Sequence, residues 1–123
     1  MNRLPLCACA ALVAAQAAFS PTASADAARG KQLYESRCIG CHSIDANRVG
    51  PAHQGVFGRK AGSVKDYDYS DALKKSKVVW NEKTLDRWLT NPEQLIPGQK
   101  MGFSVPSPKD RTDLIDYLKT QTR

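Results

Sequence analysis

The stretch "CIGCH", residues 38–42, places two thiols three positions apart, with an imidazole directly after the second thiol. Such a trio can bind a metal ion, form a reversible disulfide, or bond covalently to a larger group. The chain around the motif therefore decides its chemistry, and through that chemistry the fold.

Residues 1–25 have the pattern of a secretory signal peptide rather than of a folded element. Arg3 is followed by an apolar, alanine-rich run up to Phe19, and Ala23-Ser24-Ala25 is a small-x-small cleavage pattern. The apolar run is too short and too rich in alanine to anchor well in a bilayer, and an uncleaved anchor is the weaker alternative. We expect cleavage after about Ala25, export to the periplasm, and one mature domain of residues 26–123.

Cleavage changes both the cysteine count and the charge. Cys7 and Cys9 leave with the signal peptide, so only Cys38 and Cys41 remain. A disulfide across two intervening residues would restrain the unfolded chain little, so the pair is not explained by stability alone. The chain has 18 basic and 12 acidic residues, and losing Arg3 lowers the excess from six to five. This charge suggests acidic partners or an anionic surface, and the scattered bases argue against nucleic acid.

The mature chain has helical patterns joined by long loops, with no repeat and no convincing strand. A loop of 27 residues in so small a domain needs a scaffold to lie on. We predict a small all-α domain whose loops wrap a large apolar cofactor, which supplies the missing core. The expected helical segments are residues 27–40, residues 71–77 capped by Ser70, a helix from Asn81 to Asn91-Pro92, and a last helix opened by Ser107-Pro108.

Three hypotheses compete for the motif. Zinc would need Cys38, Cys41, His42 and His53 together, and adjacent Cys41 and His42 reach one tetrahedral ion poorly. A reactive thiol pair favours a helix N-terminus and flanking strands, whereas this motif follows a predicted helix. C-x-x-C-H is also the attachment motif for haem c, in which the two thiols join the vinyl groups and the histidine reaches the iron. The signal peptide and the missing core favour one covalent haem on Cys38 and Cys41.

Met101 is the candidate for the second axial ligand. It is the only methionine left after the signal peptide is removed, and it lies in the turn-rich segment 96–103. A lone methionine is more often a core filler, but a C-x-x-C-H motif reverses that expectation. Ligation by His42 and Met101 would leave no open site for O₂ or peroxide chemistry. An open-site haem enzyme or sensor would require that Met101 does not bind the iron.

Five stretches together carry a resemblance to a known family. They are "GKQLYESRCIGCH" (30–42), "GPAHQGVFGR" (50–59), "YDYSDALKKSKVVWNEKTLDRWLTNP" (67–92), "IPGQKMGF" (96–103) and "RTDLIDYLK" (111–119). With these stretches in this order, the mature chain resembles class I, mitochondrial-type cytochrome c of the bacterial periplasmic branch. The resemblance implies a small cytochrome c fold of about five short helices around one covalent haem, and electron transfer rather than enzymatic catalysis. It also implies that Gly30 and Tyr34 cross the last helix near Leu114 and Tyr117.

The resemblance implies roles for four further residues. The carbonyl of Pro51 would accept the N–H of the haem-ligating histidine and orient its ring. Arg59, Tyr69 and Trp80 match positions that hydrogen-bond the haem propionates, and buried carboxylates need such donors. Plain core packing is the alternative for Tyr69 and Trp80.

Some positions depart from the family pattern. His53 stands where leucine is usual, and we expect it to pack near the haem or to be partly exposed, with a rival role as axial ligand as the alternative. Gln99 replaces a threonine that commonly touches a propionate, and Trp88 replaces a tyrosine near the methionine sulfur. Glu93 stands where mitochondrial forms carry a docking lysine.

The function expected is one-electron transfer in the periplasm by a monomer that serves a respiratory chain. Partners would be membrane reductase or oxidase complexes and periplasmic dehydrogenases, which dock transiently over a small area. Exposed lysines such as Lys31, Lys60 and Lys100 would steer this docking. A haem subunit or dedicated electron acceptor of a larger dehydrogenase complex is the alternative.

Overall fold

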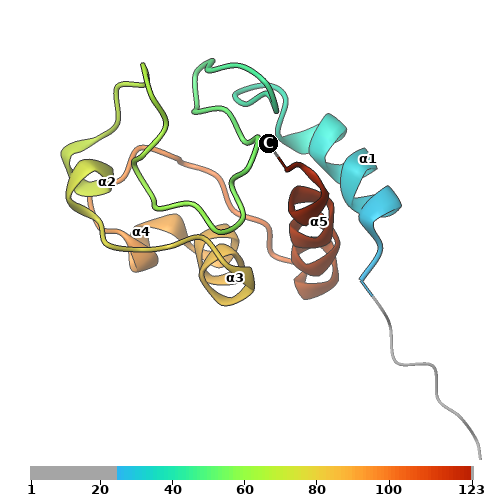
Figure 1. Ribbon diagram of the computed structural model, residues 1–123. Coiled ribbons are helices and arrows are strands. Elements are labelled where there is room, and N and C mark those ends of the chain that lie inside the picture. The colour runs from blue at the N-terminus through green and yellow to red at the C-terminus, as the bar shows by residue number, and fades with distance from the viewer. Residues whose placement is uncertain (1–24, 123) are drawn as a thin grey trace, which may run out of the picture.

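The computed structural model describes residues 25–122, and these residues form five helices joined by long loops (Figure 1). One isolated antiparallel bridge joins Lys60 and Val79, and no strand forms within the described residues. The all-α prediction is therefore confirmed. The helices are α1 (Ala27–Arg37), α2 (Asp71–Lys75), α3 (Glu82–Thr90), α4 (Pro92–Leu95) and α5 (Pro108–Thr120).

Capping side chains set the helix boundaries. Ser70, Asn81 and Ser107 each accept a backbone N–H of the first turn, as the sequence predicts. Helix α2 ends at Lys75 rather than at residue 77, because Ser76 takes an extended backbone. Helix α1 likewise ends at Arg37 rather than at residue 40, because Cys38 caps it and the chain turns there. The predicted starts of α1, α2, α3 and α5 are thus confirmed, whereas the predicted ends of α1 and α2 lie two to three residues too far along the chain.

Helix α4 lies in a stretch that the sequence predicted as loop. Asn91 closes α3 and also caps α4, since its side chain accepts the N–H of Gln94. Pro92 occupies the first turn of α4, where its missing N–H costs nothing. The proline that ends one helix therefore begins the next, and the chain turns toward the loop that holds Met101.

Helices α1 and α5 cross at one side of the molecule (Figure 1), and a glycine makes the crossing close. A β-carbon on Gly30 would lie 1.9 Å from the carbonyl oxygen of Asp113. The rings of Tyr34 and Tyr117 lie 5.4 Å apart, and Leu114 is only 1% exposed. The crossing that the family resemblance implied is confirmed.

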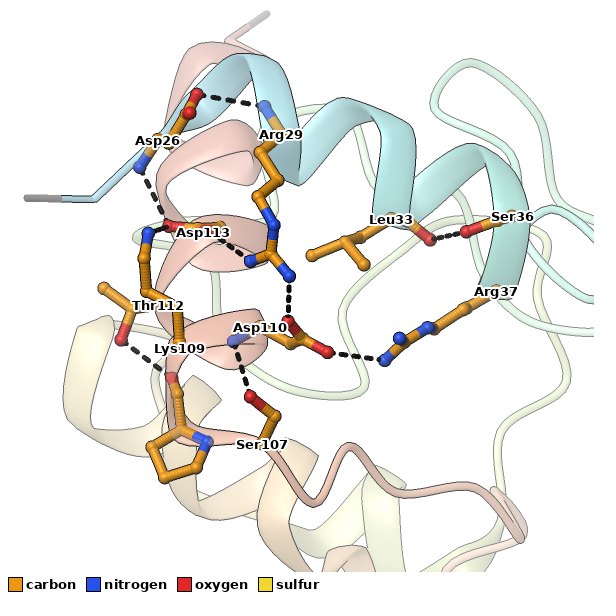
Figure 2. A network of polar contacts seen from close by, with 11 residues as sticks. Asp26, Arg29, Leu33, Ser36, Arg37, Ser107, Lys109, Asp110, Thr112 and Asp113 are labelled. Atoms are coloured by element: carbon orange, nitrogen blue, oxygen red, sulfur yellow. Dashed lines mark hydrogen bonds and ion pairs between the residues drawn. The ribbon is translucent and has the colours of Figure 1, made fainter. Parts of the chain in front are cut away.

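A network of ion pairs covers the same crossing (Figure 2). Asp113 is fully buried and pairs with Arg29 at 2.5 Å and with Lys109 at 2.6 Å. Asp110 pairs with Arg29 at 2.5 Å and with Arg37 at 2.9 Å. The family resemblance implied the contact between these helices, but nothing in the sequence indicated this polar network.

The long loop between α1 and α2 packs against the carboxyl end of α5 and against α2. Near its middle, the N–H of Gly55 donates to the carbonyl of Gln121 just after α5, at 2.6 Å. Further along, Gly62 has φ +72°, and a β-carbon there would lie 2.3 Å from the carbonyl oxygen of Leu73. Only glycine suits that turn against α2.

No helix within residues 25–122 is long and apolar enough to cross a membrane. The predicted signal peptide lies outside the described residues, apart from Ala25, which is exposed.

Candidate functional site

The CIGCH stretch forms a turn that continues from the carboxyl end of α1. Cys38 caps the helix, and its N–H donates to the carbonyl of Tyr34 at 2.9 Å. The N–H groups of Cys41 and His42 both donate to the carbonyl of Cys38, at 3.1 and 2.8 Å. Two free thiols and an imidazole are thereby held on one short turn.

The thiols do not have the setting of a redox-active pair. Burial raises the pKa of Cys38 to about 11, against a smaller lowering by the charge of Arg37. The carboxyl end of a helix also disfavours a thiolate, whereas reactive pairs use the amino end. The protonated Cys38 thiol and its place at the end of α1 therefore argue against a redox switch.

Zinc also lacks a site. Among residues 25–122, no three His, Cys, Asp or Glu side chains are placed to hold a metal ion. In particular, His53 does not complete a set with Cys38, Cys41 and His42. A metal at this motif would need ligands supplied by another group.

One ring nitrogen of His42 is committed and the other is left available. Its Nδ1 lies 2.9 Å from the carbonyl oxygen of Pro51, which can only accept, so Nδ1 carries the proton. Burial lowers the pKa of His42, and the hydrogen bond to Pro51 opposes this only in part, so the neutral ring is favoured. Neutral imidazole with Nδ1–H keeps the Nε2 lone pair for a metal.

Gly50 makes room for this ring. A β-carbon there would lie 2.2 Å from Cε1 of His42 and 2.6 Å from its Nδ1. Gly50 is buried, and its N–H donates to the carbonyl of Cys41 at 2.7 Å. Local sequence pattern gave no role to this glycine, because its contact is across the turn rather than along the chain.

His53 stacks on His42 instead of facing it. The two ring centroids are 4.0 Å apart, with planes only 20° from parallel, and Nδ1 of His53 lies 2.9 Å from the hydroxyl of Tyr34. Burial, then the neighbouring His42 and Arg59, hold the pKa of His53 well below its usual value. The His53 ring is thus occupied by its stacking on His42 and by its bond to Tyr34. Packing beside the ligand is therefore favoured over a role as rival ligand.

A chain of hydrogen bonds ties the Met101 segment to α4. The N–H of Met101 donates to Oε1 of Gln99 at 2.5 Å, and Nε2 of Gln99 donates to Glu93 at 3.2 Å. The other carboxylate oxygen of Glu93 accepts the N–H of Gly98 at 2.9 Å. Gln99 and Glu93, which the sequence showed only as departures from the family pattern, hold the backbone of half-buried Met101.

Arg59 and Trp80, two of the three residues matched to propionate donors, lie on neighbouring segments. The N–H of Trp80 donates to the carbonyl of Arg59 at 2.9 Å, across the isolated bridge. The Arg59 guanidinium donates to the carbonyls of Ala52 and Gln54 at 2.9 and 3.0 Å. Tyr69 is buried, and its hydroxyl accepts a backbone N–H at 3.2 Å, which leaves its own proton to donate.

The donor set and the apolar surface both fit a covalent haem. The two thiols and the free Nε2 match the attachment groups and one axial ligand. Several apolar side chains also remain partly exposed, including Ile39 at 47% and Phe103 at 42%, and a large apolar group would cover such surface. The hydrophobic residues that pack on the core while only partly buried are Cys38, Ile44, Val64, Tyr67, Ala72, Val78, Trp88, Leu89, Leu95 and Tyr117.

Comparison with known proteins extends over nearly all of the described chain. The family model for cytochrome c matches residues 27–122. Cytochrome c from Cochliobolus lunatus is 46% identical over 102 residues, which is 80% of this chain and 94% of that protein. Cytochrome c from Arabidopsis thaliana is 45% identical over 102 residues, or 80% of this chain and 91% of that protein. The solved structure of cytochrome cH from Methylobacterium extorquens is similar with a TM-score of 0.74 and 44% identity, over 77% of this chain and 98% of that one.

Proposed function

The chain belongs to the cytochrome c family, and from this we propose that it is a periplasmic one-electron carrier with His42 and Met101 as axial ligands. The family binds haem c covalently, and Cys38 and Cys41 fit its C-x-x-C-H motif. The protein is an electron carrier like its relatives, and not an enzyme. When bound, the haem supplies the one-electron couple.

The hydrogen bond from His42 Nδ1 to the Pro51 carbonyl is the observation that carries the ligand assignment. It fixes the tautomer, so that Nε2 keeps its lone pair, and it sets the direction in which Nε2 points. It also makes the imidazole more basic and hence a stronger donor to the metal. Gly50 and the turn at Cys38 hold the backbone around this ring.

The second ligand is proposed from the anchoring of the Met101 segment. Glu93 and Gln99 bond its backbone before the methionine. After it, the N–H of Val105 donates to the carbonyl of Leu89 on α3 at 2.7 Å. A thioether held between two anchored points can fill the sixth position and deny it to O₂ or peroxide, which favours a carrier over an open-site enzyme or sensor.

We assign Arg59, Tyr69 and Trp80 as donors to the propionates. The backbone hydrogen bond between Trp80 and Arg59 brings two of them together, and a guanidinium, a phenol and an indole are each able to donate to a carboxylate. Such donors offset the cost of placing carboxylates in a partly buried site.

Docking is proposed to be transient and steered by exposed lysines. Lys31, Lys60 and Lys100 are all exposed, and the pair of Lys31 with Glu35 at 3.8 Å is a weak surface contact. The rate of electron transfer to an acidic partner should therefore fall as salt rises, because exposed charges are screened. A rate that does not depend on salt would rule out this steering.

Periplasmic location and the bacterial branch rest on two supports. The cleavage pattern Ala23-Ser24-Ala25 predicts export. Similarity to cytochrome cH of Methylobacterium extorquens supports a bacterial relative of the same family.

A visible spectrum of the purified holoprotein tests the ligand pair. Wild type should show the sulfur-to-iron band in the oxidised state, and Met101→Ala should lose it. Gly102→Ala is the matched control, because a β-carbon on Gly102 meets no protein atom within 4 Å. Absence of the band in wild type, or its persistence in Met101→Ala, would refute the sixth ligand. Copurification with a stable partner, rather than elution as a monomer, would favour the subunit of a dehydrogenase complex.

A further inference from the structure

The backbone nitrogen of Asp26 bonds to a carboxylate that is fully buried at the crossing of α1 and α5 (Figure 2). The N–H donates to Oδ1 of Asp113 at 2.9 Å. The same oxygen accepts from Lys109 at 2.6 Å, and Oδ2 accepts from Arg29 at 2.5 Å. Both oxygens of Asp113 are thus occupied by donors from the two helices and from the residue where the predicted cleavage falls.

We propose that signal-peptide cleavage after Ala25 turns the Asp26 nitrogen into an ammonium group that forms an ion pair with the buried carboxylate of Asp113 and so locks α1 onto α5. Hydrolysis of the Ala25–Asp26 peptide bond by a signal peptidase consumes one water. Ala25 leaves with the new carboxylate, and Asp26 keeps the amine, which takes up a proton at neutral pH. The inference rests on the proposed cleavage site and not on the haem chemistry.

An ammonium makes a stronger bond to this carboxylate than the amide does. A hydrogen bond with a charged donor is about twice as strong as a neutral one, and Asp113 lies out of water, where the attraction is least screened. Burial by itself raises the pKa of Asp113, but its bonds to Lys109, Arg29 and the Asp26 N–H leave it below the usual value, so it is ionised at neutral pH. The anion needed for the pair is therefore in place.

The residue before the cleavage point lines a cavity with several charged groups. Ala25 lines a cavity of about 90 Å³ between α3 and α5. Three carboxylates line the same cavity, those of Glu82, Asp86 and Asp116, and one cation, Lys119. Lys119 bonds to Glu82 at 2.9 Å, and Asp86 bonds to Arg111 at 2.7 Å. Cleavage therefore removes Ala25 from a cavity whose lining carries three carboxylates and one cation.

Two effects oppose the pair: repulsion from Arg29 and Lys109, which already pair with Asp113 at 2.5 and 2.6 Å, and the dipole of α1. A positive charge at the amino end of a helix is unfavourable, because the helix dipole is positive there. Two carboxylates offset it at this point, Asp113 and the side chain of Asp26 itself, which accepts the N–H of Arg29 at 3.0 Å. Arg29 and Lys109 are the remaining charged groups that face the amine from α1 and α5.

The first test uses the exported holoprotein without any substitution. Intact mass should show a chain that begins at Asp26, and an NMR titration of its α-amino group should give a pKa above the ordinary value of about 7.7–8.0. A mature chain that begins at another residue would overturn the cleavage step. A chain that begins at Asp26 with an α-amino pKa at or below the ordinary value would overturn the ion pair. Neither result bears on the axial ligands, so failure here and failure of the proposed function are distinguishable.

The second test moves the charge by one residue. Insertion of one alanine between Ala25 and Asp26 gives a mature chain whose Asp26 nitrogen is an amide again. Its melting temperature at pH 7 should be lower by about 4–8 °C. The same insertion combined with Asp113→Asn should cost less, because the carboxylate is gone. Equal losses in both backgrounds, or no loss, would overturn the pair.

The pH dependence of this difference follows from the raised α-amino pKa. A raised folded pKa gives stability that is fully present below the unfolded value of about 7.7–8.0 and is lost as pH rises through the folded pKa. The difference in melting temperature between the wild-type chain and the alanine-insertion variant should therefore disappear in the alkaline range. A gap that stays constant up to about pH 10, where the amine is neutral, would contradict an ionic origin.

Discussion

The substitution Gly50→Ala tests whether the protein matrix positions the His42 ring. The new β-carbon would lie 2.2 Å from Cε1, 2.6 Å from Nδ1 and 2.7 Å from Nε2, whereas ordinary contact begins at 3.4 Å. The Gly50 backbone is held by bonds to Cys41 at 2.7 Å and to Arg48 at 2.8 Å. The ring, rather than the backbone, must therefore move by roughly 1.2 Å to restore ordinary contact.

That movement removes the bond that orients the ligand. Displaced by this amount away from Gly50, Nδ1 of His42 would leave the 2.9 Å hydrogen bond to the Pro51 carbonyl. Overpacking costs about 1–3 kcal/mol and the lost hydrogen bond about 1 kcal/mol, so the free energy of unfolding should fall by about 2–4 kcal/mol. The melting temperature should fall by at least about 8 °C.

Thermal unfolding and the reduction potential of the holoprotein measure the two effects. Without the Pro51 bond the imidazole is less basic and stabilises the ferric state less, so the potential should rise as well. Gly40→Ala is the matched control within the haem-binding motif itself, because a β-carbon on Gly40 meets no protein atom within 4 Å. If Gly50→Ala melts and titrates like Gly40→Ala, the inference that Gly50 and Pro51 position the ring is wrong.

Three further predictions concern the α1–α5 side of the molecule. Gly30→Ala should lower the free energy of unfolding, measured in urea, by more than about 2 kcal/mol. The clash of a β-carbon 1.9 Å from the Asp113 carbonyl oxygen outweighs the gain of about 1 kcal/mol in helix propensity. An unchanged free energy would contradict the close crossing. Tyr34→Phe should lower the free energy of unfolding by about 1–3 kcal/mol, because His53 loses its hydrogen-bond partner. Adding His53→Leu should restore most of that free energy, and both variants should keep the methionine-ligated spectrum. Hydrogen bonds from Arg29 lower the pKa of Asp110, and the pKa of Asp113 is also lowered despite its burial. Their stabilisation is present above about pH 4 and is lost as pH falls through the folded values, so circular dichroism should show acid unfolding beginning below about pH 4 and displaced upward in Asp110→Asn.

The sequence predicted those parts of the fold that depend on local patterns. Ser70, Asn81 and Ser107 mark helix starts because a capping oxygen needs only a partner three residues along. The motif CIGCH predicts its cofactor, because all its reactive groups lie within five residues, whereas the turn it forms was predicted as helix up to residue 40. Local patterns did not predict the start of α4, since Asn91-Pro92 was interpreted only as the end of α3 and also begins α4.

Local sequence patterns did not predict which side chains, far apart in the chain, contact one another. Gln99 and Glu93 read as losses from the family pattern, yet in the fold they bond one another and hold the backbone of Met101. His53 was expected to pack near the haem or to be partly exposed, with axial ligation as the alternative. Its stacking on His42 and its bond to Tyr34 are seen only in the fold. Each partnership depends on the direction of a side chain in a folded turn, which residue type alone does not specify.

The sequence by itself determined the class of fold, the starts of α1, α2, α3 and α5, the covalent haem motif and the family, because these follow from short-range spacing and from matches along the chain. Only the tertiary structure decided that Gly50 makes room for the His42 ring and that Asp113 is buried among cations from two helices. Asp26 and Asp113 are separated by 87 positions and meet only because α1 crosses α5 at a glycine. Contacts of that kind are set by close packing, which brings distant segments together after the local elements have formed.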